Sequence, residues 1–438
     1  MSRILFWACV VAVAGFLFGF DTAVISGADK PIQALWQTSP IFHGVFVMSS
    51  ALWGTVLGAL FGNIPTDRLG RKFTLVIIGF LYLFSALGSA LAQDPYTFAI
   101  MRFIGGIGVG ISSIAAPAYI AEIAPAKYRG RLVALYQFQI VFGILVAFFS
   151  NYLISGISND DWRWMLGIEV LPAIAFISLI LIAPESPRWL VLHGQQNEKA
   201  LSVFESLGHT KAQALKLVTQ IVEHSTHSDR LLSKKHLPLV MLVFLIAMFN
   251  QLSGINFIIY YAPRVFELAG LDTSASLLST AGIGITNLIF TMLGMYLIDK
   301  AGRKKLLYIG SVGYIISLVM VALGFNGSID NEFIVVFVFS FIASHAVGQG
   351  AVIWVFIAEI FPNAIRSKGQ SIGSGTHWVF AAIITLVMPY FLSNFLPAQI
   401  FTFFAVAMFF QLLFVYFLMP ETKGRTLEQT MPSVFSKD

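Results

Sequence analysis

Long apolar runs separated by short polar gaps make up most of this chain. An apolar run of about 20 residues is long enough to cross a bilayer as a helix. The pattern therefore predicts an all-α membrane protein with twelve transmembrane helices. The predicted helices are 4–26, 43–64, 73–93, 97–120, 131–153, 163–183, 237–262, 275–298, 305–325, 332–358, 370–393 and 398–419.

The polar gaps contain three charged signatures, and each occurs twice in the same order. One half of the chain is thus a copy of the other, which predicts two six-helix bundles. A duplicated membrane protein of this kind is most often a transporter, with its site where the halves meet. The signatures are DRLGRK at 67–72 and DKAGRK at 299–304, EIAP at 122–125 and EIFP at 359–362, and PES at 184–186 and PET at 420–422, at offsets of 232, 237 and 236 residues.

This repeat divides the chain into four predicted parts. Residues 1–189 form the first bundle, 190–236 a cytoplasmic linker, 237–420 the second bundle and 421–438 a cytoplasmic tail. In the linker, Leu215, Val218 and Val222 recur at helical spacing among charged residues, which predicts short amphipathic helices beneath the membrane. Two interpretations of the linker stay open, a simple tether and a part in gating.

Composition agrees with an integral membrane protein. Hydrophobic residues make up 57% of the chain and charged residues 11%, whereas a soluble domain is roughly one quarter charged. If the N-terminus is cytoplasmic, all of the 27 Lys and Arg except Lys30, Arg102, Arg163 and Arg264 lie on the cytoplasmic side or in its loops. Basic residues stay on that side, so we expect both termini to be cytoplasmic. The positive net charge then reflects topology, and no nucleic-acid partner is expected.

Three ionisable residues lie within predicted helices, where they are costly and usually functional. They are Asp21, Arg102 and Glu169. Each is about five or six residues from the outer end of its predicted helix, or about 8–10 Å deep at 1.5 Å per residue. This shared depth permits a three-way contact, in which both carboxylates could not stay charged at low cost beside one arginine. Two readings stay open, a proton-coupling group and a permanent salt bridge that fastens helices.

The charged signatures lie at the cytoplasmic ends of neighbouring helices. Acids and bases recur there in matched positions, which favours a latch that joins the two halves when the inside is closed. The alternative is that they only enforce topology and cap helices. The candidate gate residues are Asp67, Arg68, Arg71, Glu122, Arg129, Glu185, Arg188, Asp299, Arg303, Glu359, Arg366 and Glu421.

Uncharged polar and aromatic residues gather in mid-helix positions, above all around the seventh predicted helix. Amides both donate and accept hydrogen bonds, which suits a polyol, and aromatic faces suit the C–H surface of a sugar ring. Asn256 and Tyr260 share a helix face, and an unwound turn at Gly254 would bring Gln251 round to them. A single such residue more often bonds a neighbouring helix, but their number favours a neutral polar ligand. The residues are Asn250, Gln251, Asn256, Tyr260, Gln137, Asn287, His377, Trp354, Trp378 and Phe18.

Two negative observations narrow the function further. The glycines at 105–110 resemble a phosphate-binding loop, but they lie within a predicted helix, where small residues indicate close helix packing. The chain shows no nucleophile–base pair and no metal-ligand spacing. We therefore expect neither an enzyme nor a cofactor or metal.

At this point the chain resembles the sugar porters of the major facilitator superfamily, in particular their bacterial proton-linked members. The match runs from Gly15 to about Glu428, and its motifs are together highly specific. The resemblance implies two six-helix bundles that rock about a central site. The motifs are GFDTAVISG at 19–27, DRLGRK at 67–72, RFIGGIGVG at 102–110, PESPRWL at 184–190, QLSGIN at 251–256 and PETKG at 420–424.

The resemblance also implies roles for individual residues. Asp21 resembles the proton-coupling aspartate of the symporters, and Arg102 and Glu169 match its charged partners. Positions that line the sugar pocket in the family are occupied here by Phe18, Gln137, Gln251, Asn256, Tyr260, Asn287, Gly350, Trp354 and Trp378.

Four departures from the family pattern leave the sugar open. Ile144 stands where a second glutamine is usual, Asn250 replaces the first of a Gln-Gln pair, His377 replaces a glutamine, and Ala351 replaces a proline. An amide lost at position 144 removes one hydroxyl contact, about 1 kcal/mol. His377 could add a second titrating group.

The sequence thus predicts a proton-coupled symporter of a neutral monosaccharide, hexose or pentose, that works by alternating access as a monomer. The expected partners are the sugar, the proton and the lipid bilayer, in a bacterial inner membrane. The main alternative is a facilitative uniporter without proton coupling. A transporter-like sugar sensor is a further alternative, although such sensors carry longer cytoplasmic extensions.

Overall fold

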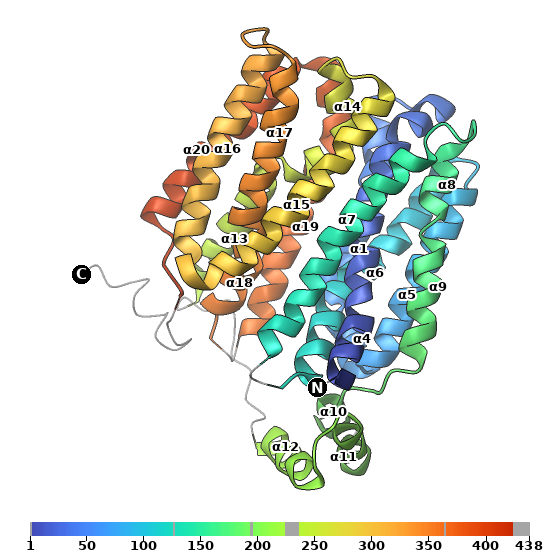
Figure 1. The fold of residues 1–438 in the computed structure, drawn as a ribbon, viewed down its shortest axis with the longest axis vertical. Coiled ribbons are helices and arrows are strands. Elements are labelled where there is room, and N and C mark those ends of the chain that lie inside the picture. The colour runs from blue at the N-terminus through green and yellow to red at the C-terminus, as the bar shows by residue number, and fades with distance from the viewer. Residues whose placement is uncertain (1, 126–127, 193–195, 224–235, 363–364, 424–438) are drawn as a thin grey trace. The chain divides into compact units, whose positions relative to one another are not determined.

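The computed structural model describes residues 2–125, 128–192, 196–223, 236–362 and 365–423. It divides into two compact units, and Figure 1 shows their helices coloured by residue number. The first comprises the described residues within 1–24, 50–147 and 159–227, and the second those within 25–49, 148–158 and 228–438. Helices α1 (Ser2–Trp36) and α7 (Arg129–Ile154) therefore contribute to both.

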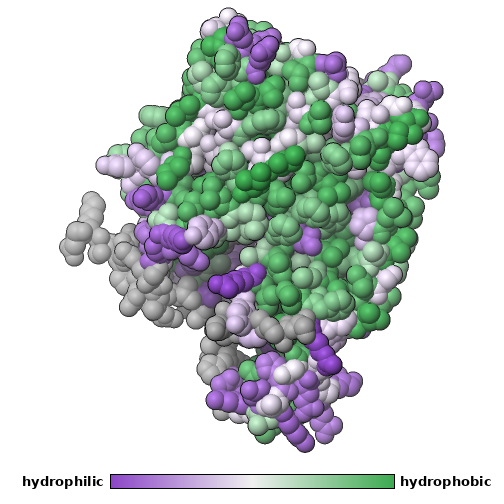
Figure 2. Space-filling model, viewed as in Figure 1, coloured by the Kyte–Doolittle hydropathy of each residue, from purple (hydrophilic) through white to green (hydrophobic). Residues whose placement is uncertain are grey.

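Within the described residues, eleven helices are long and apolar enough to cross a membrane, and a twelfth span results if one bent pair is counted as a single span. That pair is Pro40–Met48 with Ser50–Phe61, bent by 42°. The predicted all-α fold with twelve transmembrane helices is confirmed. Figure 2 shows a largely hydrophobic surface on these helices, with hydrophilic residues gathered at their ends.

The first unit contains most of the helices of the first repeat. Close packing between α3 and α6 depends on glycine, because a Cβ added at Gly106 would lie 1.8 Å from the carbonyl oxygen of Ala51. This confirms that the glycines at 105–110 serve helix packing. The further helices of this unit are α3 (Ser50–Phe61), α4 (Asn63–Arg68), α5 (Arg71–Leu91), α6 (Pro95–Ile123), α8 (Asp161–Gly167), α9 (Val170–Leu181), α10 (Pro187–Leu192), α11 (Asn197–Ser206) and α12 (Lys211–Glu223).

The second unit holds the helices of the second repeat, and in Figure 1 α16 lies beside both α17 and α20. Two short π-helical segments, η1 and η2, occur in this unit, and such segments often mark functional sites. Its elements are α2 (Pro40–Phe42), η1 (His43–Met48), α13 (Leu237–Leu252), α14 (Ile255–Leu268), α15 (Thr273–Ala301), α16 (Arg303–Phe325), α17 (Glu332–His345), η2 (Ala346–Gly350), α18 (Ala351–Ile360), α19 (Arg366–Asn394) and α20 (Pro397–Phe417).

The end predicted for the first helix is wrong. The polar residues after position 26 suggested a loop, yet α1 continues through Pro31 to Trp36. The buried Asp29 is satisfied by Arg264 and His43, and Lys30 is paired with Glu267, so these polar residues do not end the helix. Asp21 consequently lies nearer the middle of α1 than predicted.

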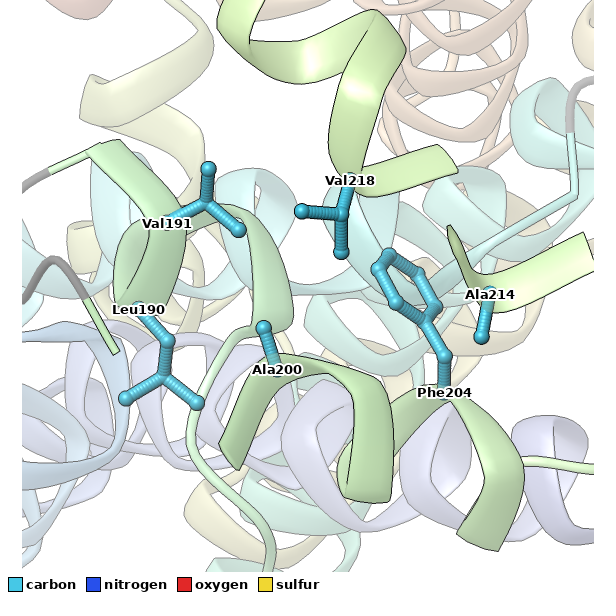
Figure 3. Close-up of a cluster of buried hydrophobic side chains, with 6 residues drawn as sticks. All are labelled: Leu190, Val191, Ala200, Phe204, Ala214 and Val218. Atoms are coloured by element: carbon cyan, nitrogen blue, oxygen red, sulfur yellow. The ribbon is translucent and has the colours of Figure 1, made fainter. Parts of the chain in front are cut away.

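The linker forms a small helical cluster of its own (Figure 3). Its buried side chains are Leu190, Val191, Ala200, Phe204, Ala214 and Val218, from α10, α11 and α12. The short helices predicted for the linker are present as α11 and α12, and the three apolar residues noted on α12 are buried to different extents. Val218 is buried, but Leu215 and Val222 are 58% and 55% exposed. The packed face is shifted because Ala214, Leu217 and Ile221 contact the neighbouring linker helices instead.

Candidate functional site

A buried ion pair joins α1 to α6 in the first unit. The guanidinium of Arg102 donates from Nη1 to the carboxylate of Asp21 and from Nη2 to the Asp21 carbonyl oxygen, the latter at 2.9 Å. Both side chains are 2% exposed. Gly105 follows one turn later on α6, and a Cβ there would lie 3.7 Å from Asp21 Oδ1. That distance is an ordinary contact, and the glycine is required instead by Ser85, whose Oγ would lie 2.3 Å from the added Cβ.

Glu169, the third predicted ionisable residue, is buried between α8 and α9 in the same unit. It lies within electrostatic reach of Asp21 and Arg102. Its Oε1 atom has no hydrogen-bond partner among the described residues. The structure thus gathers the three residues, but Asp21 takes the arginine and Glu169 stays a second acid without a donor at Oε1.

A cluster of amides surrounds the break between α13 and α14 in the second unit. The break is at Gly254, whose φ of +87° is in the left-handed region that favours glycine. It turns the chain so that Asn256 Nδ2 donates to Gln251 Oε1 at 2.9 Å, as the predicted unwound turn requires. Gln251 Nε2 in turn donates to Asn250 Oδ1 at 3.0 Å.

Aromatic rings of α18 and α19 lie beside these amides. Gln251 Nε2 is 3.1 Å from His377 Nε2. The His377 ring is 4.9 Å from the Trp354 ring and 4.8 Å from the Trp378 ring, measured between centroids. Trp354 is the exposed member, at 36%. Amides and aromatic faces therefore meet in the second unit, which is the combination that a sugar requires.

The other predicted binding residues lie on α14, η2, α15, α1 and α7. Tyr260 is buried on α14, Gly350 ends η2 beside His345, and Asn287 on α15 accepts a hydrogen bond from Thr291 of the same helix at 3.3 Å. Phe18 and Gln137 belong to the first unit, on α1 and α7. These helices pack closely, since a Cβ at Gly19 would lie 1.9 Å from the carbonyl oxygen of Ile140.

The charged signature of the first repeat forms a network centred on Arg71. Its guanidinium binds both oxygens of Glu122, at 2.9 and 3.0 Å, and also Asp67 at 3.2 Å. Glu185 accepts hydrogen bonds from the backbone N–H groups of Arg71 and Lys72, each at 3.0 Å, at the N-terminus of α5. Backbone donors and the helix dipole both favour an anion there.

The second unit repeats this network. Arg303 binds Glu359 at 2.7 and 3.0 Å and Asp299 at 3.2 Å. Glu421 accepts from the backbone N–H groups of Arg303 and Lys304, each at 3.0 Å. The two networks agree bond by bond, which extends the sequence repeat to the geometry. Each ion pair lies within its own unit, and a latch between the halves stays a prediction.

The remaining gate residues make lesser contacts. Arg129 Nε donates to the Ala121 carbonyl at 3.1 Å, and Arg366 Nε to the Phe361 carbonyl at 3.4 Å. Arg68 and Arg188 are exposed. No group of three or more His, Cys, Asp or Glu residues that could hold a metal is found in the described part of the chain.

Sequence reasoning missed two clusters in the second unit. Gln349, Gln411 and Ser311 are fully buried and continue the amide cluster inward. The sequence did indicate them, because Gln349 and Gln411 each interrupt a run of apolar residues. Asp29 and His43 were missed because the first helix was ended too early. They form a buried cluster in which Arg264 Nη2 donates to Asp29 Oδ1 at 2.8 Å and His43 Nε2 contacts the same atom at 2.7 Å.

Glu185 and Glu421 occupy matching positions in the two repeats, but their pKa values are shifted in opposite directions. Burial raises the pKa of Glu185 above its usual range, although backbone N–H groups oppose the shift. Burial also acts on Glu421, but the N–H groups of Lys423, Arg303 and Lys304 outweigh it and lower its pKa. The stabilisation from Glu185 is therefore present below the unfolded-state pKa, about 4.3, and lost as pH rises through the raised value. That from Glu421 is present above about pH 4.3 and lost as pH falls through the lowered value.

We expect Glu185→Gln and Glu421→Gln to respond oppositely to acidification. Thermal unfolding in detergent between pH 7 and pH 4 measures this. On acidification, the stability of wild type relative to Glu185→Gln should increase. Its stability relative to Glu421→Gln should stay level and then decrease near the acid end. Parallel curves for the two variants would contradict the expectation.

Comparison with known proteins decides the family. A family model described as "Sugar (and other) transporter" matches residues 7–433. This chain belongs to the sugar transporter family. It is 34% identical to the arabinose-proton symporter of Bacillus subtilis, over 98% of this chain and 94% of that protein. It is also 34% identical to the D-xylose-proton symporter of Escherichia coli K12, over 96% of this chain and 93% of that protein.

The solved structures of the family agree. The sugar transporter described here matches the xylose transporter XylE from E. coli in a partially occluded inward-open conformation. The TM-score is 0.87 at 32% identity, over 97% of this chain and 100% of that chain. The predicted resemblance to major facilitator sugar porters is thereby confirmed. The protein is a multi-pass membrane transporter and not an enzyme.

Proposed function

We propose that this sugar transporter is a proton-coupled symporter of a neutral monosaccharide, a hexose or pentose, that works by alternating access. The observation that carries the proposal is the buried pair of Asp21 and Arg102, within a chain of this family. Relatives named as symporters carry arabinose and D-xylose respectively. Because the two names differ, the substrate class is proposed and the individual sugar is left open.

The geometry of the ion pair supports proton coupling through Asp21. Arg102 holds the Asp21 carboxylate as long as it is charged. Protonation removes one charge of the pair, weakens the contact between α1 and α6, and so changes the balance between conformations. Glu169, whose Oε1 has no hydrogen-bond partner among the described residues, interacts electrostatically with both members of this pair. Coupling requires that sugar binding favour the same conformation as protonation.

Sugar recognition is assigned to both halves. In the second unit the amides of Asn250, Gln251 and Asn256 offer hydrogen bonds, and Trp354 and Trp378 offer apolar faces. The remaining proposed contacts come from Phe18, Gln137, Tyr260, Asn287, Gly350 and His377.

The repeated charge networks are proposed to form the cytoplasmic gate. Each network holds a loop and the neighbouring helix ends together within its own half, and their release would let the inside open. In this scheme both termini are cytoplasmic, the membrane is a bacterial inner membrane, and the monomer is the working unit. The two bundles are 1–189 and 237–420, with the linker at 190–236 between them and the tail at 421–438.

The first test is external pH, recorded in a lightly buffered suspension of energy-depleted cells that express the protein, while monosaccharides are added one at a time. A symporter should give an alkaline jump with its substrate, since each sugar that enters brings a proton. Cells without the protein provide the control. Uptake of labelled sugar with no pH change would instead establish the alternative, a facilitative uniporter.

A further inference from the structure

The amides of the second unit form one continuous hydrogen-bonded chain with a single direction. We call it the amide chain. It starts at the α13–α14 break and runs inward to α16. Asn256 is 7% exposed, whereas every other member is 2% exposed or less, so only this end is open. In order, the members are Asn256, Gln251, Asn250, Gln349, Gln411 and Ser311.

The direction of the chain is set at its inner end. The Leu307 carbonyl oxygen can only accept, so the Ser311 hydroxyl donates its single proton to it, at 2.8 Å. Ser311 Oγ must then accept from Gln411 Nε2, at 2.8 Å. Gln411 therefore turns its Oε1 toward Gln349, whose Nε2 donates to it at 2.8 Å. One backbone carbonyl thus fixes the orientation of two glutamine amides.

The same constraint passes outward to the predicted sugar-binding residues. Gln349 Oε1 accepts from Asn250 Nδ2 at 3.4 Å, and Asn250 Oδ1 accepts from Gln251 Nε2 at 3.0 Å. Gln251 Oε1 accepts from Asn256 Nδ2 at 2.9 Å. His377 Nε2 also lies 3.1 Å from Gln251 Nε2 and accepts its second proton in the tautomer that leaves this ring nitrogen unprotonated. At the open end, Asn256 Oδ1 accepts no bond within the amide chain and faces outward, and one proton of Asn256 Nδ2 is also uncommitted within the chain.

Two features keep this arrangement rigid. Gln349 lies in the π-helical segment η2, which changes the register of the helix and aims the side chain between α13 and α20. Gln349, Gln411 and Ser311 are 0% exposed. In such surroundings a flipped amide would leave buried donors facing donors, which costs free energy.

We propose that Gln349, Gln411 and Ser311 are positioning residues for substrate selection. They fix the orientation of the amides of Asn250, Gln251 and Asn256, so that Asn256 Oδ1 at the open end accepts a hydrogen bond from a sugar hydroxyl that donates. The proposal rests on the proposed sugar transport. It assigns a role to three residues that do not touch the sugar.

The test compares each monodeoxy and monodeoxyfluoro analogue of the transported sugar as a competitor of uptake. Fluorine can accept a weak hydrogen bond but cannot donate one. At the ring position that faces the open end, both analogues should bind about tenfold more weakly than the parent sugar, the cost of one hydrogen bond near the upper end of its range. At a position where the protein donates, the fluoro analogue should bind better than the deoxy analogue.

Variants then separate positioning from structure. Ser311→Ala removes the terminal anchor and lets the amides flip, so the penalty on the fluoro analogue should fall below about threefold. Ser311→Thr keeps the hydroxyl and should keep the full penalty. Ser344→Ala is the matched control, because Ser344 makes the same kind of bond to its own helix, at 2.8 Å, outside the amide chain. Gln411→Met breaks the next link and serves if Ser311→Ala does not fold.

The outcomes are distinct. A wild-type protein that carries its sugar but binds every fluoro analogue as well as the parent overturns the inference alone. A full tenfold penalty retained in Ser311→Ala or Gln411→Met does so too. A wild-type protein that neither binds nor carries any monosaccharide overturns the proposed function, and the inference with it.

Discussion

Replacement of Asp21 by asparagine should abolish uphill sugar accumulation while sugar exchange continues. One charge that crosses 100 mV supplies about 2.3 kcal/mol, enough for roughly fifty-fold accumulation. Asparagine cannot release a proton, so the sugar should only equilibrate, and the ratio of internal to external sugar should fall to about one. Arg102 keeps its bond to the Asp21 backbone carbonyl, at 2.9 Å, which holds the two helices together in the variant. Uptake of labelled sugar into energised cells and counterflow in proteoliposomes measure the two activities.

A matched control is available on the same helix. Asp29 is as buried as Asp21 and is likewise paired with an arginine, Arg264. Asp29→Asn removes a carboxylate of the same kind but from a cluster that the proposed coupling does not use. It should keep uphill accumulation even if its rate falls. Accumulation retained in Asp21→Asn, or lost equally in both variants, would contradict a specific coupling role and favour a salt bridge that only fastens helices.

The sequence predicted the helices well because their signal is long and local. Apolar length sets a span, and the repeat of charged signatures sets the order of the two halves. The one helix that was ended wrongly is informative. Asp29 and Lys30 look like loop residues, but partners on α14, remote in sequence, let them lie within α1. The hydrophobic pattern of one helix does not show which distant residues will pair with its polar side chains.

The residues of the candidate site were predicted from the sequence, but the hydrogen bonds and ion pairs between them were not. The predicted shared depth of Asp21, Arg102 and Glu169 rested on a first helix that ended at 26, whereas α1 ends at Trp36. Only the packing of α1 against α6 decides that Asp21 takes the arginine. The amides around Gly254 were expected together, because the turn is encoded by the glycine itself. Gln349 and Gln411 were not, because their contact depends on η2 and on the approach of α20.

The linker is a second case in which the sequence pattern predicts a helix but not which of its faces is buried. Leu215, Val218 and Val222 satisfy helical periodicity, yet of these only Val218 belongs to the packed face, together with Ala214, Leu217 and Ile221. Two stripes of similar hydrophobicity lie side by side on α12. Which one is buried depends on where α10 and α11 lie, and periodicity alone cannot decide it.

Glycine at position 106 should be the most demanding packing position in the first unit. A Cβ there would lie 1.8 Å from the carbonyl oxygen of Ala51, and backbone cannot move aside as a side chain can. Gly106→Ala must therefore separate α3 from α6. We expect a loss of about 3 kcal/mol or more, the upper end of the cost of overpacking, and Gly106→Leu should not fold. Thermal unfolding in detergent and the yield of folded protein measure both variants.

Gly130→Ala is the control for this prediction. Gly130 lies near the start of α7, is exposed, and has no atom within 4 Å of an added Cβ. Alanine favours the helix over glycine by roughly 0.5–1 kcal/mol, so this variant should be neutral or slightly more stable. The same substitution thus changes stability in opposite directions at the two glycines, for opposite reasons. Equal unfolding temperatures for the two variants would mean that α3 and α6 are not in close contact at Gly106.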